Sequence, residues 1–116
     1  MKHYRWDDVP LEALSPTIGR RMITGEKSMA ARVYIKKGAV VPEHKHESEQ
    51  ITYILKGALE FQIDGRTVMV RTGEVLVIPS WMPHSATAVE DTDDLDFFCP
   101  PRQDWLTGND AYLRGK

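Results

Sequence analysis

The stretch Gly38–Gly57, GAVVPEHKHESEQITYILKG, decides how this chain folds. It holds two histidines one residue apart, His44 and His46, and a glutamine, Gln50, four positions after the second. Side chains alternate along a β-strand, so the two imidazoles are expected on one face of a strand. Further along, the apolar run GEVLVIP leads into a third histidine, His84. The pattern therefore predicts a β-structure that gathers imidazoles.

Three imidazoles and one side-chain oxygen are a suitable donor set for a borderline divalent metal. The predicted ligands are His44, His46, Gln50 and His84. A lone histidine is more often a surface or core residue, but only His3 lies outside this pattern. The expected cofactor is zinc, nickel, iron, manganese or cobalt, because ligand type alone does not choose among them. The glutamine amide is uncharged, which leaves the metal a stronger Lewis acid and favours isomerase or lyase chemistry over oxygen activation.

Composition narrows the class of protein. The chain has 116 residues, so one domain over 1–116 is expected. Its 15 basic and 17 acidic residues give a net charge of −2 without a basic run, which argues against a nucleic-acid partner. One cysteine, Cys99, excludes an internal disulfide, and the N-terminus lacks the apolar core of a signal peptide. No apolar run has the length of a membrane span. We expect a cytoplasmic protein with no membrane partner.

Short apolar runs separated by Gly, Pro and Asp predict an all-β sandwich or small barrel. Residues 1–18 are interpreted as a lead-in arm, and residues 102–116 as a tail with one or two helical turns. Asp64-Gly65 is a strong hairpin signal. The expected strands are 28–35, 50–55, 59–63, 66–70, 75–78, 85–89 and 94–98.

Strand alternation also assigns faces. If Gln50 points to the metal, Thr52 and Ile54 point inward as well. The remaining side chains of this strand then face outward: Ile51, Tyr53 and Leu55. Because these three are large and apolar, their face should be covered, and a second copy of the chain could cover it. A homodimer is therefore expected. Small residues on the face of His84, namely Ala86 and Ala88, would leave room for a ligand above the metal.

The spacing of these residues resembles that of the cupin superfamily. The first cupin motif is matched by Gly38, His44, His46 and Gly57, with Gln50 where glutamate is usual. The second motif is matched by Gly73, Pro79 and His84, while Trp81 replaces a glycine and Ala88 an asparagine. The resemblance implies a single-domain cupin β-barrel, a jelly roll or double-stranded β-helix, with its motif core at 38–88.

The end of the chain adds a second resemblance. Asp96 and Phe98 share a strand face, and Pro100-Pro101 precedes Arg102. With the three histidines and Gln50, this stretch resembles the KdgF-type small cupins of pectin and alginate breakdown. The resemblance implies that a 4,5-unsaturated uronate, a sugar acid, opens and tautomerises to a linear keto acid. Asp96 would be the general acid/base, Arg102 would bind the carboxylate or position Asp96, and Phe98 would pack on the sugar.

Other interpretations stay open at this point. Trp81 could wall the pocket as a second substrate contact, or belong to the core or an interface. The chain could be an Fe(II)-dependent dioxygenase, or a non-catalytic cupin that binds a sugar acid or a metal. Asp96 could simply pair with Arg102. Several cations expected near the pocket could bind a carboxylate or be merely solvated. They are Arg20, Arg21, Arg32 and Lys37.

Overall fold

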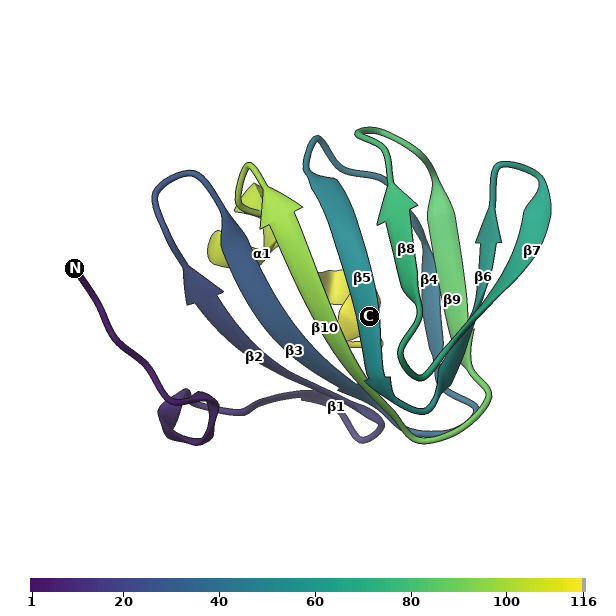
Figure 1. Ribbon diagram of the computed structural model, residues 1–116, viewed down its shortest axis with the longest axis horizontal. Coiled ribbons are helices and arrows are strands. Elements are labelled where there is room, and N and C mark those ends of the chain that lie inside the picture. The colour runs from purple at the N-terminus through teal and green to yellow at the C-terminus, as the bar shows by residue number, and fades with distance from the viewer. Residues whose placement is uncertain (116) are drawn as a thin grey trace.

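The structure, a computed structural model, describes residues 1–115, and Lys116 at the end of the expected tail lies outside that range. Strands dominate the described residues, and the helical pieces are one turn long (Figure 1). No helix within residues 1–115 combines the length and apolar character needed to cross a bilayer. The strands are β1 Glu12–Ser15, β2 Ile18–Thr24, β3 Met29–Ile35, β4 Val40–His44, β5 Glu49–Lys56, β6 Ala58–Ile63, β7 Arg66–Arg71, β8 Val75–Ile78, β9 His84–Ala88 and β10 Thr92–Cys99. The helical pieces are η1 Trp6–Asp8, α1 Gln103–Leu106 and η2 Ala111–Leu113.

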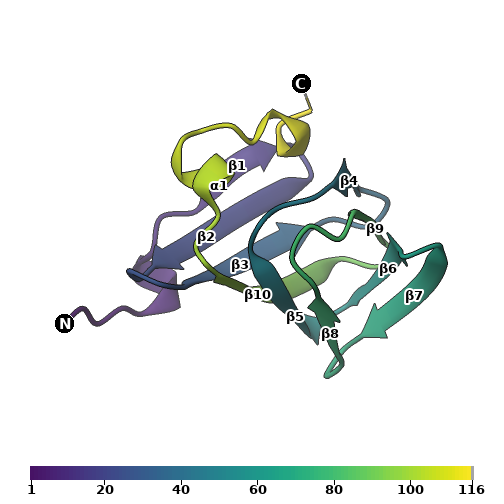
Figure 2. The ribbon, with the colours of Figure 1, turned by 90° about the horizontal axis from the view of Figure 1, so that it is seen from above.

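Two antiparallel sheets form the barrel. One sheet has the order β1-β2-β3-β10-β5-β8, and the other has the order β4-β9-β6-β7. Consecutive strands often lie in different sheets, so chain segments distant in sequence become neighbours, as β3, β10 and β5 do (Figure 1). The predicted all-β jelly-roll class is confirmed. Figure 2 shows the C-terminal segment with α1 and η2 lying over β1 and β2 and reaching toward β4.

The core lies between the sheets because apolar side chains recur at every second strand position. On β3, Met29, Ala31, Val33 and Ile35 are all buried. On β5 and β10 the inward positions are different, since polar side chains interrupt the apolar ones. The buried polar residues of these two strands are Gln50, Thr52, Thr92, Asp94 and Asp96. Burying a polar group in a small core costs folding free energy unless the group is hydrogen-bonded. Polar side chains at these positions therefore indicate a functional site.

Predictions of local structure that depend on a few neighbouring residues were confirmed. Asp64 and Gly65 have φ values of 52° and 69° and join paired residues Ile63 and Arg66, as an Asp-Gly hairpin turn requires. The inward placement of Thr52 and Ile54 beside Gln50 was also correct. The tail forms one-turn helical pieces, as expected for its described part.

Two expectations were wrong. Residues 1–18 are not only an arm, because Glu12–Ser15 forms β1 and Leu14 is buried in the core. This short edge strand is specified by its pairing with β2 rather than by its own sequence. The two neighbouring histidines also do not share a strand, because β4 ends at His44 and His46 lies in the connection to β5.

The barrel depends on glycine at position 57. Gly57 has φ +98°, and a Cβ there would lie 2.4 Å from the carbonyl oxygen of Asp91 and 2.6 Å from Thr92 Oγ1. We expect Gly57→Ala to lower the free energy of unfolding by more than about 1–3 kcal/mol, because a clash adds to the backbone strain. Gly38→Ala is the matched control, since Gly38 has φ +88° but open space around it. Denaturant unfolding should rank the two variants in that order, and equal losses would contradict the steric argument.

Candidate metal centre

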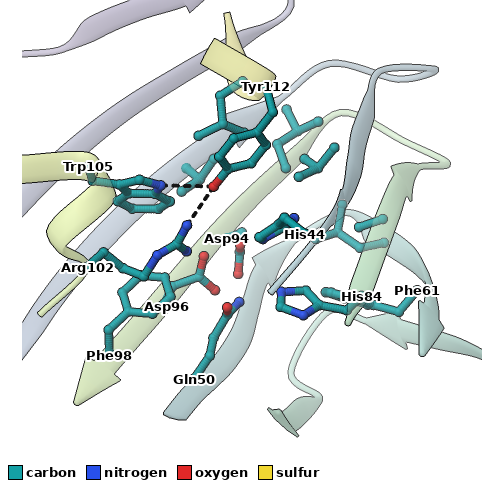
Figure 3. A pocket seen from close by; sticks show the side chains of 16 residues that line it. His44, Gln50, Phe61, His84, Asp94, Asp96, Phe98, Arg102, Trp105 and Tyr112 are labelled. Atoms are coloured by element: carbon teal, nitrogen blue, oxygen red, sulfur yellow. Dashed lines mark hydrogen bonds between the residues drawn. The ribbon is translucent and has the colours of Figure 1, made fainter. Parts of the chain in front are cut away.

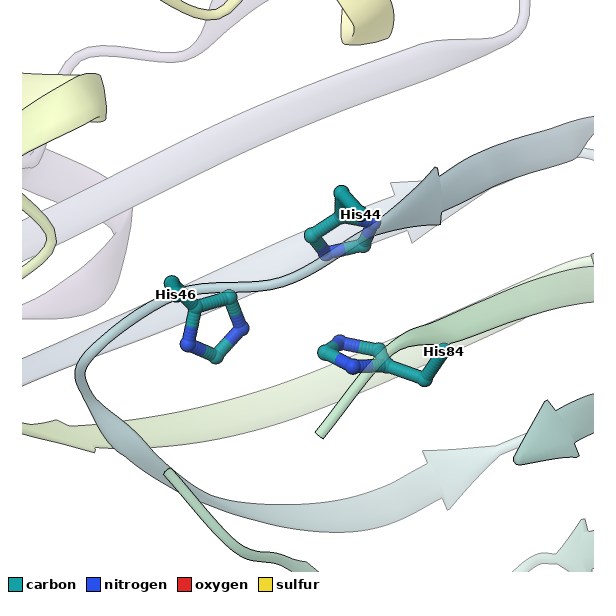
Figure 4. Close-up of side chains that lie close together, drawn as sticks. All are labelled: His44, His46 and His84. Carbon is teal, nitrogen blue, oxygen red and sulfur yellow. The ribbon is translucent and has the colours of Figure 1, made fainter. Parts of the chain in front are cut away.

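Three histidine side chains converge inside the barrel (Figure 4). His44 ends β4 and is paired across the sheet with His84, which begins β9, while His46 approaches from the connection to β5. One ring nitrogen from each lies within 4.8 Å of the others. The structure therefore brings together the three predicted imidazoles, and such a group could hold a metal ion.

Backbone carbonyl groups fix the orientation of each imidazole. Nδ1 of His44, His46 and His84 lies 2.8 Å from a carbonyl oxygen two residues away, that of Pro42, Ser48 and Met82 respectively. A carbonyl only accepts hydrogen bonds, so each Nδ1 carries the proton and each Nε2 keeps its lone pair. Nε2 of His46 and of His84 is buried without a hydrogen-bond partner. Orphaned lone pairs that face one another are what a metal would satisfy.

Burial also keeps the imidazoles neutral. Desolvation lowers the pKa of His44 to about 3 and that of His46 to about 4, and it lowers the pKa of His84 as well. The positive charge of Arg102 acts in the same direction on all three. A neutral imidazole is the form that binds metal, so the site is ready for a cation at neutral pH.

The amide of Gln50 is the fourth predicted ligand. Its Nε2 donates to Thr52 Oγ1 at 2.8 Å, and that hydroxyl donates to Asp96 Oδ1 at 2.8 Å. Because the hydroxyl proton is used on the carboxylate, its oxygen must accept from the amide nitrogen. The amide oxygen of Gln50 is thereby left buried and without a hydrogen-bond partner. An orphaned oxygen beside the histidines fits a hard or borderline divalent metal, and Gln50 as a ligand remains a prediction.

Two carboxyl groups lie on the inward face of β10. Asp94 and Asp96 are each only 4% exposed, and burial raises the pKa of both. For Asp94 the adjacent charge of Asp96 raises the pKa further. The sequence analysis identified Asp96 but missed Asp94, although strand alternation would have placed both on one face. Carboxyl groups with raised pKa values in a cavity are suited to move protons near neutral pH.

Arg102 lies directly before α1 and is almost fully buried. It donates from Nε and Nη2 to the two carboxylate oxygens of Asp104, at 2.9 and 2.7 Å, so the ion pair is with Asp104 rather than with Asp96. Its guanidinium lies 5.2 Å from the ring centroid of Phe98 and 4.5 Å from that of Trp105. Arg102 is thus held rigidly at the edge of the cavity.

A cavity of about 50 Å³ lies between these groups (Figure 3). Both sheets and the C-terminal segment contribute to its lining. Of the two small residues predicted to leave room for a ligand, Ala86 lines the cavity and Ala88 does not. The functional candidates that line it are His44, Gln50, His84, Asp94, Asp96, Phe98, Arg102, Trp105 and Tyr112.

Some predicted residues lie elsewhere. Trp81 is 60% exposed and lines a separate surface depression beside His46. The four other cations are not among the residues that line the cavity. Three of them have partners elsewhere: Arg20 pairs with Glu12 and Asp110, Arg21 donates to Tyr34, and Arg32 pairs with Asp93. Lys37 is exposed.

The comparison with protein families agrees with this geometry. Residues 31–100, more than half of the chain, match the Cupin domain family. The chain is a cupin. This cupin is 34% identical over 110 residues to the pectin degradation protein KdgF of Dickeya dadantii (strain 3937), a match that covers 91% of this chain and 100% of that protein. It is also 31% identical over 77 residues to the oxalate-binding protein of Thermotoga maritima, covering 66% of this chain and 64% of that one.

Solved structures extend the likeness. KdgF from Halomonas sp. superposes with a TM-score of 0.83 and 31% identity, covering 90% of this cupin and 100% of that chain. Oxalate decarboxylase of Bacillus subtilis, which has Mn(II) centres, superposes with a TM-score of 0.74 at 24% identity over 84% of this chain and 29% of its own. The second likeness concerns the fold alone.

The lowered histidine pKa values predict how metal binding depends on pH. Three imidazoles of ordinary pKa would lose roughly a thousandfold in metal affinity between about pH 7.5 and about pH 5.5, because protons would compete at each. Here His44 and His46, with pKa values of about 3 and about 4, stay unprotonated over that range, and the pKa of His84 is lowered as well. The affinity of the metal-free protein for Zn²⁺ should therefore fall by less than about tenfold. Calorimetric titration at both pH values measures it.

Two variants control this titration. His84→Ala should bind Zn²⁺ far more weakly, whereas His3→Ala should match the wild type, since His3 is exposed at the N-terminus. A steep loss of affinity toward pH 5.5 would show that the imidazoles titrate normally.

Proposed function

We propose that this cupin is a metal-dependent enzyme of carbohydrate metabolism that promotes ring opening and tautomerisation of a 4,5-unsaturated uronate to a linear keto acid. Two findings support the proposal. The first is 34% identity to a pectin degradation protein over 91% of the chain. The second, which carries the proposal, is that a buried carboxyl group with a raised pKa, Asp96, shares one cavity with His44, His84 and Gln50.

The reaction is an isomerisation and needs no oxidant or second substrate. The hydroxyl proton at C1 is removed, the bond between C1 and the ring oxygen breaks, and C1 becomes an aldehyde. The ring oxygen becomes the enol oxygen at C5. The enol then loses its O–H proton and gains one at C4, which gives the keto group. One acid/base group that can hold and return a proton is sufficient for the last step.

Asp96 has the properties that this proton transfer requires. Burial raises its pKa above the ordinary value of an aspartate, while the hydroxyl of Thr52 fixes one carboxyl oxygen at 2.8 Å. As the acid/base group, Asp96 would exchange its proton with the substrate in the cavity that it lines. A side-chain hydrogen bond with Asp94, two residues earlier on the same face, acts against burial and lowers the pKa of Asp96.

The remaining residues would bind and orient the sugar acid. A metal held by His44, His46, His84 and Gln50 would supply Lewis-acid polarisation of a substrate oxygen. Arg102 would attract the carboxylate through its positive charge and through Nη2, which also donates to the Tyr112 hydroxyl, and Phe98 would pack on the sugar face. Trp81 would contact substrate only from outside the cavity, beside His46.

Asp96→Asn tests the assignment. The amide cannot shuttle the proton, so kcat for a 4,5-unsaturated galacturonate should fall by about 10²–10⁴-fold. The bound metal per chain should not change, because the three histidines are untouched. Turnover is measured as loss of the conjugated enol absorbance above the spontaneous rate, with metal content determined on the same samples.

Asp93→Asn is the matched control for Asp96→Asn. Asp93 lies on the same strand but pairs with Arg32 on the outer face. It should retain wild-type turnover. If Asp96→Asn kept full activity, Asp96 would not be the general acid/base. If the metal-loaded wild type gave no chelator-sensitive turnover, the isomerase proposal would fail, and oxygen consumption would then decide for or against an Fe(II) dioxygenase.

A second candidate is a non-catalytic protein that binds a small organic acid. The observation that favours it is the 31% identity to an oxalate-binding protein. The cavity volume of about 50 Å³ also suits a small organic acid better than it suits a sugar ring. Binding of oxalate without any turnover of the unsaturated uronate would favour this function over the first.

We also propose that the protein acts as a homodimer. Its outer face carries a continuous apolar patch across β10, β5 and β8, in which Phe97 neighbours Ile51, and Ile51 neighbours Val77. Two residues away along each strand, Leu95 neighbours Tyr53, and Tyr53 neighbours Val75. Five of these six side chains are at least 39% exposed: Ile51, Tyr53, Val75, Val77 and Phe97. β8 is an edge strand, so the patch reaches the rim of the sheet.

A charge placed in this patch should separate the subunits. We expect Ile51→Glu, at the centre of the patch, to convert a dimer to a monomer, because an unpaired carboxylate would be buried at the interface. Val40→Glu is the control, since Val40 is equally apolar and 54% exposed but lies on the other sheet. Sedimentation equilibrium measures the mass. A wild-type protein that sediments as a monomer would overturn the dimer.

A further inference from the structure

The hydroxyl group of Tyr112 fills an unusual position in the cavity (Figure 3). It accepts two hydrogen bonds, from Arg102 Nη2 at 2.6 Å and from Trp105 Nε1 at 3.0 Å. The ring of Tyr112 stacks on the imidazole of His44 with centroids 4.7 Å apart and planes 28° apart. The neutral hydroxyl of Tyr112 therefore lies where two donors converge, the cationic Arg102 and the neutral Trp105. This point is beside His44, a predicted metal ligand.

These donors are better matched to a carboxylate than to a phenol. Arg102 and Trp105 can only donate, and their side chains are almost fully buried. Bonds from such donors to an ionised oxygen are roughly twice as strong as bonds to a neutral one. A buried pair of donors aimed at one point needs an acceptor there, and among the described residues the Tyr112 hydroxyl accepts from both.

The size of the cavity requires a lining side chain to move before a sugar acid can enter. About 50 Å³ holds a few water molecules, whereas pockets for larger ligands span about 300–1,000 Å³. Most of the lining comes from paired strands. Tyr112 belongs instead to η2, near the end of the chain.

The backbone around Tyr112 is nevertheless anchored. Asp110 is fully buried and pairs with Arg20 at 3.0 Å and with Arg114 at 2.8 Å, and Leu113 packs in the core. A rearrangement of this segment would therefore fall on the Tyr112 side chain, whose hydroxyl bonds and stacking on His44 place it in the cavity. Rotation of this side chain would open space and free both donors at once.

We propose that Arg102 and Trp105 form a carboxylate-binding subsite, which the hydroxyl of Tyr112 occupies in the free protein and leaves when an acid ligand binds. This inference rests on the proposed function for its ligand class, a uronate. It adds two residues, Trp105 and Tyr112, that the sequence did not indicate. Trp105 adds a neutral donor to the cationic donor of Arg102, and Tyr112 is an internal competitor for both.

Equilibrium binding to the metal-loaded protein tests this subsite. The probe is D-galacturonate, and D-galactose is the matched sugar without a carboxylate. Tyr112→Phe removes the competing oxygen but keeps the ring, so galacturonate should bind about 5–10-fold more tightly, the value of one hydrogen bond. Trp105→Phe removes one donor and should weaken galacturonate binding by a similar factor. Galactose binding should change in neither variant.

Tyr34→Phe is the matched control for Tyr112→Phe. The Tyr34 hydroxyl also accepts from an arginine, Arg21, at 2.8 Å, but it lies outside the cavity. It should bind galacturonate as the wild type does. Thermal unfolding of each variant verifies that the fold is intact. If Trp105→Phe does not fold, Arg102→Lys, which keeps the charge but loses the planar fork, should show the same selective loss for galacturonate.

The outcomes separate this inference from the proposed reaction. Tighter galacturonate binding by Tyr112→Phe supports the subsite even if the protein turns over no unsaturated uronate. Unchanged or weaker galacturonate binding by Tyr112→Phe overturns the subsite, even with full turnover. Failure of the wild type to prefer galacturonate over galactose also overturns it.

Discussion

Strand alternation forces polar side chains into the interior of this barrel, and the rest of the site follows from how they are satisfied. Gln50, Thr52 and Asp96 point inward because their neighbours must point outward. A relay of hydrogen bonds satisfies the amide nitrogen, the hydroxyl and one carboxyl oxygen. It leaves the amide oxygen of Gln50 without a partner, next to two histidine nitrogens in the same condition. The fold thus concentrates unsatisfied lone pairs where a cation would bind.

The hydrogen bonds that the three imidazoles make to the backbone explain why the histidine cluster tolerates burial. Each ring donates its Nδ1 proton to a nearby carbonyl, so no extra element is needed to hold it in orientation. Desolvation and Arg102 keep the rings neutral, which avoids three positive charges in a small volume. Asp94 and Asp96 experience the opposite effect, since burial favours their protonated forms. One apolar barrel thereby keeps the imidazoles neutral for a metal and raises the pKa of two carboxyl groups beside them.

The C-terminal segment completes the cavity, and its chemistry differs from that of the strands. Trp105 is in contact with two guanidiniums, those of Arg20 and Arg102, at 4.6 and 4.5 Å from its ring centroid. Asp110 joins the segment to β2 through Arg20. The cover of the site is therefore fixed by ion pairs and cation–π contacts, while the metal side is fixed by backbone hydrogen bonds. The two sides meet where the ring of Tyr112 stacks on His44.

The sequence by itself determined the fold class, the Asp64-Gly65 hairpin and the histidine set, because each depends on spacing along a few residues. It also determined that Asp96 and Phe98 share a face. Only the tertiary structure decided that His46 leaves the strand, that Arg102 pairs with Asp104, and that Trp81 stays outside the cavity. Tyr112 reaches His44 across 68 positions of the chain, and no local pattern encodes such a contact. Packing of the tail against two sheets is a property of the whole barrel, so it had to be seen in three dimensions.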